Sequence, residues 1–525
     1  MSSTFFTPET PLAARPAGPA SGSGHDTPGA RPAPLALIIG SGFGGLAAAI
    51  RLSCKGYRVE VLEKLDGPGG RAYVFKQDGF TFDGGPTIIT VPQLFEELWA
   101  LCGKKLSDDV ELRLMDPFYR IRFPDGTHFD YSGDAEKMRA EVARVNADDL
   151  PGFDRFVAEA DKCYQLGFEQ LGGVAFDSFG DLLAALPSML KMRAWRTMYG
   201  MVSSYLKHPK LRMAMSLQTL LIGGNPFSVT SVYSLINALE RRFGVYSAMG
   251  GTGALIRGMV KLLNERGVNV RYNAEVRKIT VENGRATGVE MASGEKLRAD
   301  IVVSNGDTAW TYKHLVDEQH RKHWTNAKID GGRYSMSLFV WYFGTSKQYP
   351  DVPHHTMVLG PRYKGLLDDI FKNHKLAQDF SLYLHRPSAT DPSAAPAGHD
   401  AFYVLSPVPH LKSGTDWRTQ TEPYRQAVLA RLEETVLPGL GQHIVSQCLL
   451  TPQDFHDRLL SHQGAAFGLE PVLLQSAWFR PHNRSEDVDG LFMVGASTHP
   501  GAGMPGVLMS AKALETVLPH VNSFR

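Results

Sequence analysis

The sequence contains few of the features that mark disulfide-rich, cysteine-zinc or nucleic-acid-binding proteins. Four cysteines occur in 525 residues, and no two of them stand in a CxxC or other paired spacing. Neither a disulfide framework nor a metal site is therefore indicated, and isolated thiols are typical of a reducing cytosol. The formal net charge is +1, so the chain has no global field that would recruit nucleic acid or acidic partners.

A long hydrophobic run is missing as well. The longest uncharged apolar stretch covers residues 35–50 and contains four glycines. A membrane-spanning helix needs about 20 predominantly apolar residues. We therefore expect no transmembrane segment.

The first 34 residues differ in composition from the rest, with seven prolines and four glycines. Such a segment cannot bury enough surface to offset the entropy lost on ordering it, so we expect a disordered tail. It lacks the basic start and apolar run of a secretory signal. We expect its deletion to have no effect.

Three separate ranges of the remaining chain, 35–101, 250–307 and 471–525, predict pieces of one α/β domain. The expected strands cover 268–272, 276–281, 286–291, 300–304 and 491–494, and the expected helices 254–265 and 507–518. Asn283-Gly284 predicts a hairpin turn between the second and third of these strands. Between these pieces, residues 102–249 are predicted to be mostly helical, most clearly over 148–162 and 179–206, and residues 308–470 to mix strands with helices. The pattern predicts a nucleotide-binding domain that is interrupted twice by a mixed α+β substrate-binding lobe.

A dinucleotide fingerprint opens this domain. Gly40-Ser41-Gly42-Phe43-Gly44-Gly45 matches GxGxxG between an apolar strand at 35–39 and a helical pattern at 46–53. Gly40 permits a tight turn, Gly42 lets the backbone approach a pyrophosphate, and Gly45 lets helix and strand pack closely. A second strand at 58–62 ends at Glu63, which stands where an acid should accept the ribose hydroxyls. This ordered set of elements predicts a Rossmann-type fold.

Further glycine-rich segments favour FAD over NAD. Residues 66–71 and 83–87 let the chain pass close to a large flat ligand. Arg71 either neutralises phosphate charge or is a surface cation. A second GxGxxG match at 501–506 is followed by only 19 residues, too few to complete another nucleotide fold. Instead, a helix that starts near Gly506 would aim its positive end at the anionic part of a reduced flavin.

Several longer motifs resemble the bacterial-type phytoene desaturases, which belong to the carotenoid and retinoid FAD-dependent oxidoreductases. They are GSGFGGLAAAIRL near residue 40, DGPGGRAY at 66–73, GFTFDGGPTIIT at 79–90, LIGGNP at 221–226, GGTGAL at 250–255, QSAWFRPHNR at 475–484 and VGASTHPGAGMPG at 494–506. The resemblance covers nearly all of residues 35–520, and only the proline-rich tail is foreign to it. It implies a Rossmann-type FAD-binding domain with a mixed α+β substrate lobe, as in amine-oxidase-like flavoproteins.

The resemblance also implies which residues contact the cofactor. Carried over position by position, the contacts with adenosine and phosphates are Gly40, Gly42, Phe43, Gly45, Glu63, Lys64, Gly70 and Arg71. Val276 would meet the adenine edge through its backbone. The contacts along the isoalloxazine end are Gly495, Gly503, Met504 and Gly506.

The activity implied by the resemblance is successive dehydrogenation of 15-cis-phytoene, through phytofluene and zeta-carotene, to neurosporene or lycopene. The partners implied are acyclic carotenes, the cytoplasmic membrane surface, and quinone or oxygen as electron acceptor. The number of steps, the acceptor and the oligomeric state cannot be read from the sequence. A redox-neutral carotenoid isomerase, a later-step carotenoid dehydrogenase and a non-enzymatic carrier remain alternatives.

The proton acceptor has no strong signature. Asp181 lies in an apolar run at 176–186, where a carboxylate would have a raised pKa, but the favoured interpretation is a helix N-terminal acid beside Ser178. His499 lies in the flavin-proximal motif and is a second candidate. The pair His354-His355 is interpreted as a structural or surface pair rather than as metal ligands.

Residues 182–206 place Lys191, Arg193 and Arg196 among leucines, methionines and aromatic residues. Such a basic amphipathic helix can lie in a membrane interface, where it could collect a water-insoluble substrate. An ordinary helix packed on the core would show the same pattern. Both interpretations stay open.

Overall fold

A computed structural model describes residues 32–524, so most of the predicted tail lies outside the described residues. A five-stranded parallel sheet in the order β19-β13-β1-β2-β9 forms the nucleotide-binding domain. Its strands are β1 (Leu35–Ile39), β2 (Arg58–Leu62), β9 (Asn269–Arg271), β13 (Ile301–Ser304) and β19 (Leu491–Met493). They come from the three ranges assigned to this domain, and the α/β fold class is confirmed.

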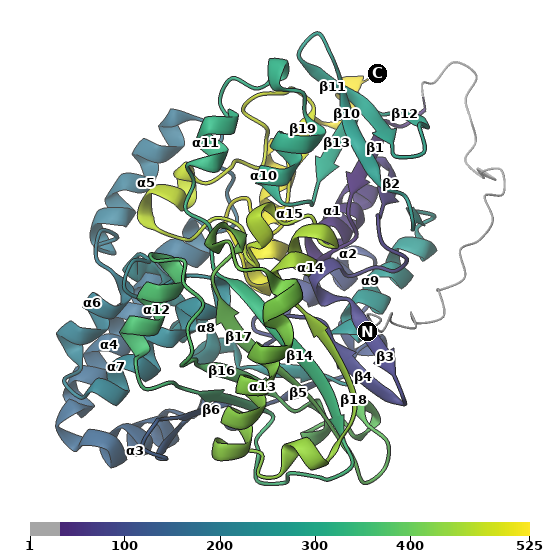
Figure 1. The fold of residues 1–525 in the computed structure, drawn as a ribbon. Helices are drawn as coiled ribbons and strands as arrows, with labels where there is room; N and C mark the ends of the chain where they lie inside the picture. The colour runs from purple at the N-terminus through teal and green to yellow at the C-terminus, as the bar shows by residue number, and fades with distance from the viewer. Residues whose placement is uncertain (1–31, 525) are drawn as a thin grey trace.

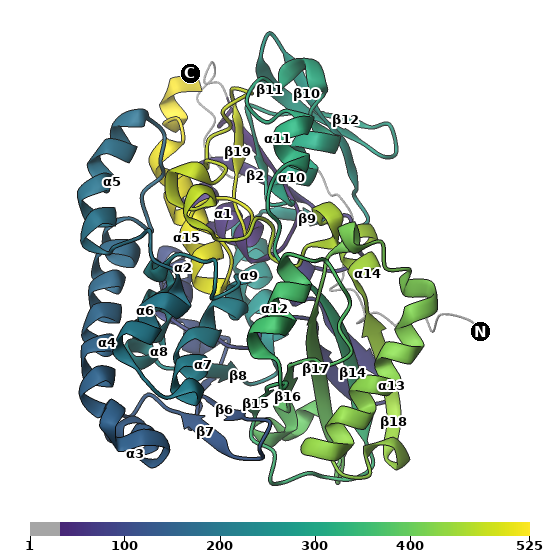
Figure 2. The same ribbon diagram turned by 60° about the vertical axis from the view of Figure 1, so that its left-hand side comes forward.

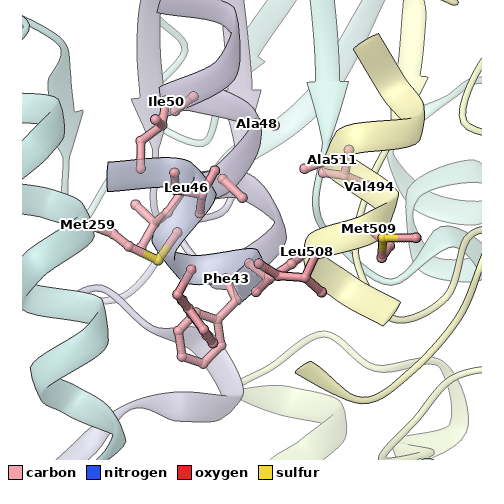
Figure 3. Close-up of a cluster of buried hydrophobic side chains, with 14 of the residues drawn as sticks. Phe43, Leu46, Ala48, Ile50, Met259, Val494, Leu508, Met509 and Ala511 are labelled. Atoms are coloured by element: carbon pink, nitrogen blue, oxygen red, sulfur yellow. The ribbon is translucent and has the colours of Figure 1, made fainter. Parts of the chain in front are cut away.

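Helix α1 (Phe43–Cys54) lies at the centre of this domain and is buried over most of its length. Figure 3 shows its apolar side chains packed between α9 (Thr252–Glu265) and α15 (Met504–Val517). Helix α2 (Gln93–Leu101) joins the same cluster. The second half of the apolar stretch at 35–50 is therefore part of a core helix.

A three-stranded antiparallel sheet extends from this domain, at the top of Figure 2. It consists of β10 (Val276–Glu282), β11 (Arg285–Met291) and β12 (Lys296–Arg298). Asn283 and Gly284 join the first two strands with φ of 50° and 79°, which are the left-handed values that a tight hairpin requires. The predicted hairpin is confirmed.

A seven-stranded sheet in the order β18-β14-β17-β16-β15-β6-β7 forms the second lobe. Its strands are β6 (Tyr119–Arg122), β7 (His128–Tyr131), β14 (Ser337–Thr345), β15 (His355–Val358), β16 (Leu382–His385), β17 (Asp400–Val408) and β18 (Ile444–Leu450). Because β6 pairs with β15, both insertions contribute to one sheet. Helix α13 (Trp417–Thr435) covers one face of it (Figure 2).

Helices of the first insertion lie along one side of the molecule (Figures 1 and 2). They are α3 (Ala135–Asn146), α4 (Leu150–Cys163), α5 (Phe179–Lys191), α6 (Met198–Tyr205), α7 (Pro209–Ser216) and α8 (Leu235–Phe243). The single helix expected over 179–206 is wrong, because the chain breaks between α5 and α6, where Arg193 has φ of 51°. Among the described helices, none combines the length and apolar character needed to cross a bilayer.

The remaining elements are short. They are β3 (Val74–Gln77), β4 (Phe80–Asp83), β5 (Leu112–Leu114), β8 (Tyr246–Ala248), α10 (Thr308–Trp310), α11 (Asn326–Asp330), α12 (Tyr363–Phe371) and α14 (Pro452–Asp457). β3 and β4 form a hairpin that packs against the seven-stranded sheet through Phe75 and Phe82. This contact closes the gap between the two lobes.

Candidate functional site

The turn between β1 and α1 has the geometry of a phosphate-binding loop. Gly40 has φ of 91°, and Gly42 precedes α1 without a side-chain cap, so the first N–H groups of the helix are free for a ligand. A Cβ on Gly45 would lie 2.0 Å from the Gly40 carbonyl oxygen. Gly40, Gly42 and Phe43 line a cavity, whereas Gly45 packs behind the turn.

Glu63 is held rigidly at the end of β2. Its side chain is 5% exposed, and Oε2 accepts hydrogen bonds from Ser41 N at 2.8 Å and Ser41 Oγ at 2.7 Å. Oε1 accepts from Leu65 N at 2.8 Å. The carboxylate thus ties the second strand to the glycine turn and borders the cavity where a ribose would bind.

Asn305 completes this end of the site and was missed by the sequence analysis. It follows β13, and a Cβ on Gly44 would lie 2.5 Å from its Oδ1. Its N–H donates to the Ile39 carbonyl, and it lines the cavity. Asn305 could have been found from the sequence, because it stands at the carboxyl end of a predicted parallel strand, where ligands usually bind.

Arg71 is shielded from bulk solvent but borders the cavity. Burial lowers the pKa of its guanidinium. Nη2 donates to Ser461 Oγ at 2.9 Å, while Nε has no partner among residues 32–524. A buried cation without a bound anion is costly, so this position suits the pyrophosphate of a dinucleotide.

The predicted flavin-proximal residues lie at the start of α15. Gly503 precedes this helix without a side-chain cap, and a Cβ on Gly506 would lie 2.5 Å from the Gly501 carbonyl oxygen. The helix therefore directs free N–H groups and its positive end into the cavity. The residues from the sequence analysis that line the cavity here and at its adenine end are Lys64, Gly70, Val276, Gly495, Gly503, Met504 and Gly506.

The cavity continues from the nucleotide turn into the second lobe, with a volume of about 560 Å³. Its far walls are apolar side chains from the seven-stranded sheet and the helical layer. They include Leu217, Leu338, Val340, Met357, Leu359 and Leu405. A cofactor end and an apolar end in one continuous space suit a dinucleotide that acts on a hydrocarbon.

Glu240 is a second functional candidate that the sequence analysis missed. It lies on α8, is 0% exposed and lines the cavity. Oε2 accepts from the Tyr119 hydroxyl at 3.0 Å, while Oε1 has no partner in the described chain. Burial raises the pKa of this carboxyl to about 8. In the sequence it precedes two arginines on an amphipathic helix, where a glutamate resembles a surface residue.

Asp181 does not have the properties expected of a proton acceptor. It closes a capping box at the start of α5, with Oδ2 accepting from Asp177 N at 3.0 Å and Ser178 N at 2.7 Å. These backbone N–H donors lower its pKa, and it is absent from the cavity wall. The raised pKa required for a proton acceptor is therefore wrong, and the structure agrees with the favoured interpretation of Asp181 as a helix N-terminal acid beside Ser178.

The histidines singled out in the sequence lie in different places. His499 is 3% exposed and lines the cavity, and burial lowers its pKa to about 3. His354 and His355 are buried on the seven-stranded sheet, behind the cavity wall.

Comparison with known proteins agrees with this geometry. Residues 43–513 match the family model of flavin-containing amine oxidoreductases. A neurosporene-forming phytoene desaturase of Cereibacter sphaeroides is 52% identical over 489 residues, which cover 92% of this chain and 94% of that protein. A lycopene-forming phytoene desaturase of a Paracoccus species is 47% identical over 487 residues, covering 93% and 97%.

Solved structures share the fold at low identity. Putrescine oxidase with bound putrescine superposes with a TM-score of 0.62 and 14% identity, covering 92% of this chain and 98% of that one. Cyclohexylamine oxidase of Brevibacterium oxydans has a TM-score of 0.60 and 15% identity, covering 94% and 100%. The chain therefore belongs to the flavin-containing amine oxidoreductases, in the group of the bacterial phytoene desaturases, and its cofactor is FAD.

Proposed function

We propose that the chain is a phytoene desaturase that dehydrogenates 15-cis-phytoene stepwise, through phytofluene and zeta-carotene, to neurosporene, lycopene or both. The observation that carries this proposal is the cavity, which runs without a break from the FAD-binding turn into an apolar chamber. The 52% identity to a neurosporene-forming desaturase and the 47% identity to a lycopene-forming one support it.

The chain's own residues divide the work of binding. Bound FAD would supply the hydride acceptor for each desaturation. Glu63 would hold the ribose, and Arg71 with the N-terminus of α1 would neutralise the pyrophosphate. The N-terminus of α15 would stabilise negative charge at the flavin end. The apolar walls position the polyene and exclude water.

Each desaturation also releases a proton, and we assign its acceptance to Oε1 of Glu240. This oxygen is unpartnered, and its carboxyl forms part of the wall of the substrate chamber. The Tyr119 hydroxyl holds the other oxygen and is itself fixed by Gln218 Nε2 at 2.9 Å. A carboxylate with a pKa of about 8 accepts a proton far more readily than an ordinary one.

The substrate enters from the cytoplasmic membrane, where the protein is bound peripherally. Apolar side chains stand in solvent around α5: Leu183 is 52%, Leu190 62% and Trp195 60% exposed. Met189 and Met192 of the same region line the cavity, so the exposed patch adjoins its entrance. A clustered apolar surface of this kind suits insertion into a lipid headgroup layer. Quinone or oxygen reoxidises the cofactor.

The proposed function is tested by expression in a bacterium that accumulates phytoene, followed by pigment chromatography against carotene standards. Yellow or red acyclic carotenes should replace phytoene, and the ratio of neurosporene to lycopene gives the number of steps. Unchanged phytoene with a protein that retains its flavin spectrum would contradict the proposal. Conversion of cis-carotenes without an electron acceptor would indicate an isomerase instead.

A further inference from the structure

Three histidines meet behind the cavity wall because of the register of two strands. β15 and β16 pair antiparallel with His355 directly opposite His385, and His354 precedes His355. The three residues are 7%, 1% and 2% exposed in the order His354, His355, His385. One side-chain nitrogen of each lies within 4.8 Å of the other two.

The hydrogen bonds of this cluster leave two nitrogens without a partner. Nε2 of His354 and Nε2 of His385 lie 3.0 Å apart. Nδ1 of His354 lies 2.7 Å from Thr390 Oγ1, and Nδ1 of His355 lies 2.7 Å from the Tyr383 hydroxyl. Nε2 of His355 and Nδ1 of His385 have no partner among residues 32–524. An unsatisfied buried group is costly, so a bound species at this point would stabilise the fold.

We propose that His354, His355 and His385 bind a divalent late transition-metal ion, with zinc the first choice. Three imidazoles are a common ligand set for zinc, whose Zn–N distance of about 2.0–2.1 Å separates tetrahedral ligands by about 3.3 Å. The Nε2 atoms of His354 and His385 are already close to that separation. One nitrogen of each histidine lies within 4.8 Å of the other two, so a small adjustment of the rings would bring three ligands to one ion, and water would take the fourth position.

The surroundings match those of a metal site. Oxygen atoms of Thr390 and Tyr383 hold the outer nitrogens of two ligands, which is the usual arrangement around metal-bound histidine.

The charges around the cluster are of both signs. Asp391 is 6% exposed and interacts with His354 as a partly compensating anion. Arg386 is a positive charge near His354, but its Nε is paired with a carboxylate oxygen of Asp400 at 3.0 Å.

The ion would hold part of the substrate chamber in place. The Tyr383 hydroxyl that contacts His355 also lies 2.9 Å from Thr87 Oγ1, and both residues line the cavity. A metal on His355 would therefore fix the orientation of Tyr383 in the chamber wall. This inference concerns a structural site and does not depend on which carotene is the substrate.

The test is the metal content of the full-length, flavin-loaded protein, purified without a metal-chelate resin and dialysed exhaustively. Elemental analysis should find one zinc ion per chain, and growth with cobalt should introduce visible absorption bands of a histidine-bound Co²⁺. His355→Ala and His385→Ala should each lose the metal, while His520→Ala, which alters an exposed histidine, should keep it.

Wild-type protein that carries its flavin but binds no zinc, even after dialysis against zinc, would overturn the proposal. Equal metal content in His355→Ala and His520→Ala would do the same. These readouts need no turnover, so they stay valid if the assigned activity is wrong.

Discussion

At the scale of single residues, the proposed function makes Glu240 the acceptor of the proton that each desaturation releases. Glu240→Gln keeps the acceptor for the Tyr119 hydroxyl but removes the base, and we expect the rate to fall by about 10²–10⁴-fold with unchanged flavin content. The wild-type rate should rise with pH around the pKa of about 8, because only the carboxylate accepts a proton. Product formation with purified protein measures both. Glu434→Gln, an exposed change on α13, is the control, and a Glu240→Gln variant with wild-type rates would exclude the assignment.

The same carboxyl makes stability depend on pH. Its pKa rises from 4.5 to about 8 on folding, so the unfolded chain ionises first and the free energy of unfolding falls as pH rises through this window. Glu240→Gln should lack this pH-dependent loss of stability. Above a pH of about 8 the variant should therefore be more stable than the wild type. Chemical denaturation at several pH values measures the difference, and parallel curves for the two proteins would refute the expectation.

Arg71 borders the part of the cavity where we expect the pyrophosphate of the cofactor. Arg71→Gln removes a cation whose Nε has no hydrogen-bond partner among residues 32–524, and we expect FAD affinity to fall about tenfold or more. Flavin titration of the apoprotein measures this change. Arg298→Gln, at an arginine that is 84% exposed, should bind FAD normally. Equal affinities would show that the pyrophosphate does not contact Arg71.

At the scale of elements, α1 packs so closely on the glycine turn that position 45 has no room for a side chain. Gly45→Ala places a methyl group 2.0 Å from the Gly40 carbonyl oxygen. We expect the free energy of unfolding to fall by about 1–3 kcal/mol or more and the protein to lose its flavin. Thermal unfolding and flavin absorbance measure both effects. The control is Gly180→Ala on α5, where the nearest atom to the new Cβ is Ser178 Oγ at 3.4 Å. Similar melting temperatures for the two variants would contradict this packing argument.

At the scale of the whole molecule, the proposed function assigns the exposed apolar patch around α5 to contact with a membrane. The double variant Leu183→Asp, Leu190→Asp should lower binding to vesicles of anionic phospholipid about tenfold or more, since two apolar side chains no longer enter the lipid. Co-sedimentation measures binding, and flavin content should stay unchanged. Val445→Asp, at a residue of β18 that is 52% exposed, should bind like the wild type. Equal loss in both would place the membrane contact elsewhere.

Much of the nucleotide-binding domain could be predicted from local patterns. The turn at Gly40, the acid at Glu63 and the hairpin at Asn283 each depend on a few neighbouring residues, whose backbone requirements are specific. The family resemblance extended the prediction to the residues at the start of α15, because the motif that contains them is contiguous in the chain. The one long helix expected over 179–206 failed for the same local reason, since helical periodicity continues across a break that tertiary packing imposes.

What the sequence determined by itself is therefore the fold class, the cofactor and the residues at the phosphate and flavin ends of the cavity. Only the tertiary structure decided which titratable side chains are buried and which residues far apart in the sequence come into contact. Asp181 and Glu240 are both carboxylates on helices, yet one faces solvent and caps a helix while the other is sealed in an apolar wall. His385 likewise joins His354 and His355 only through strand register. Solvation and long-range pairing set these properties, and neither is written in a local pattern.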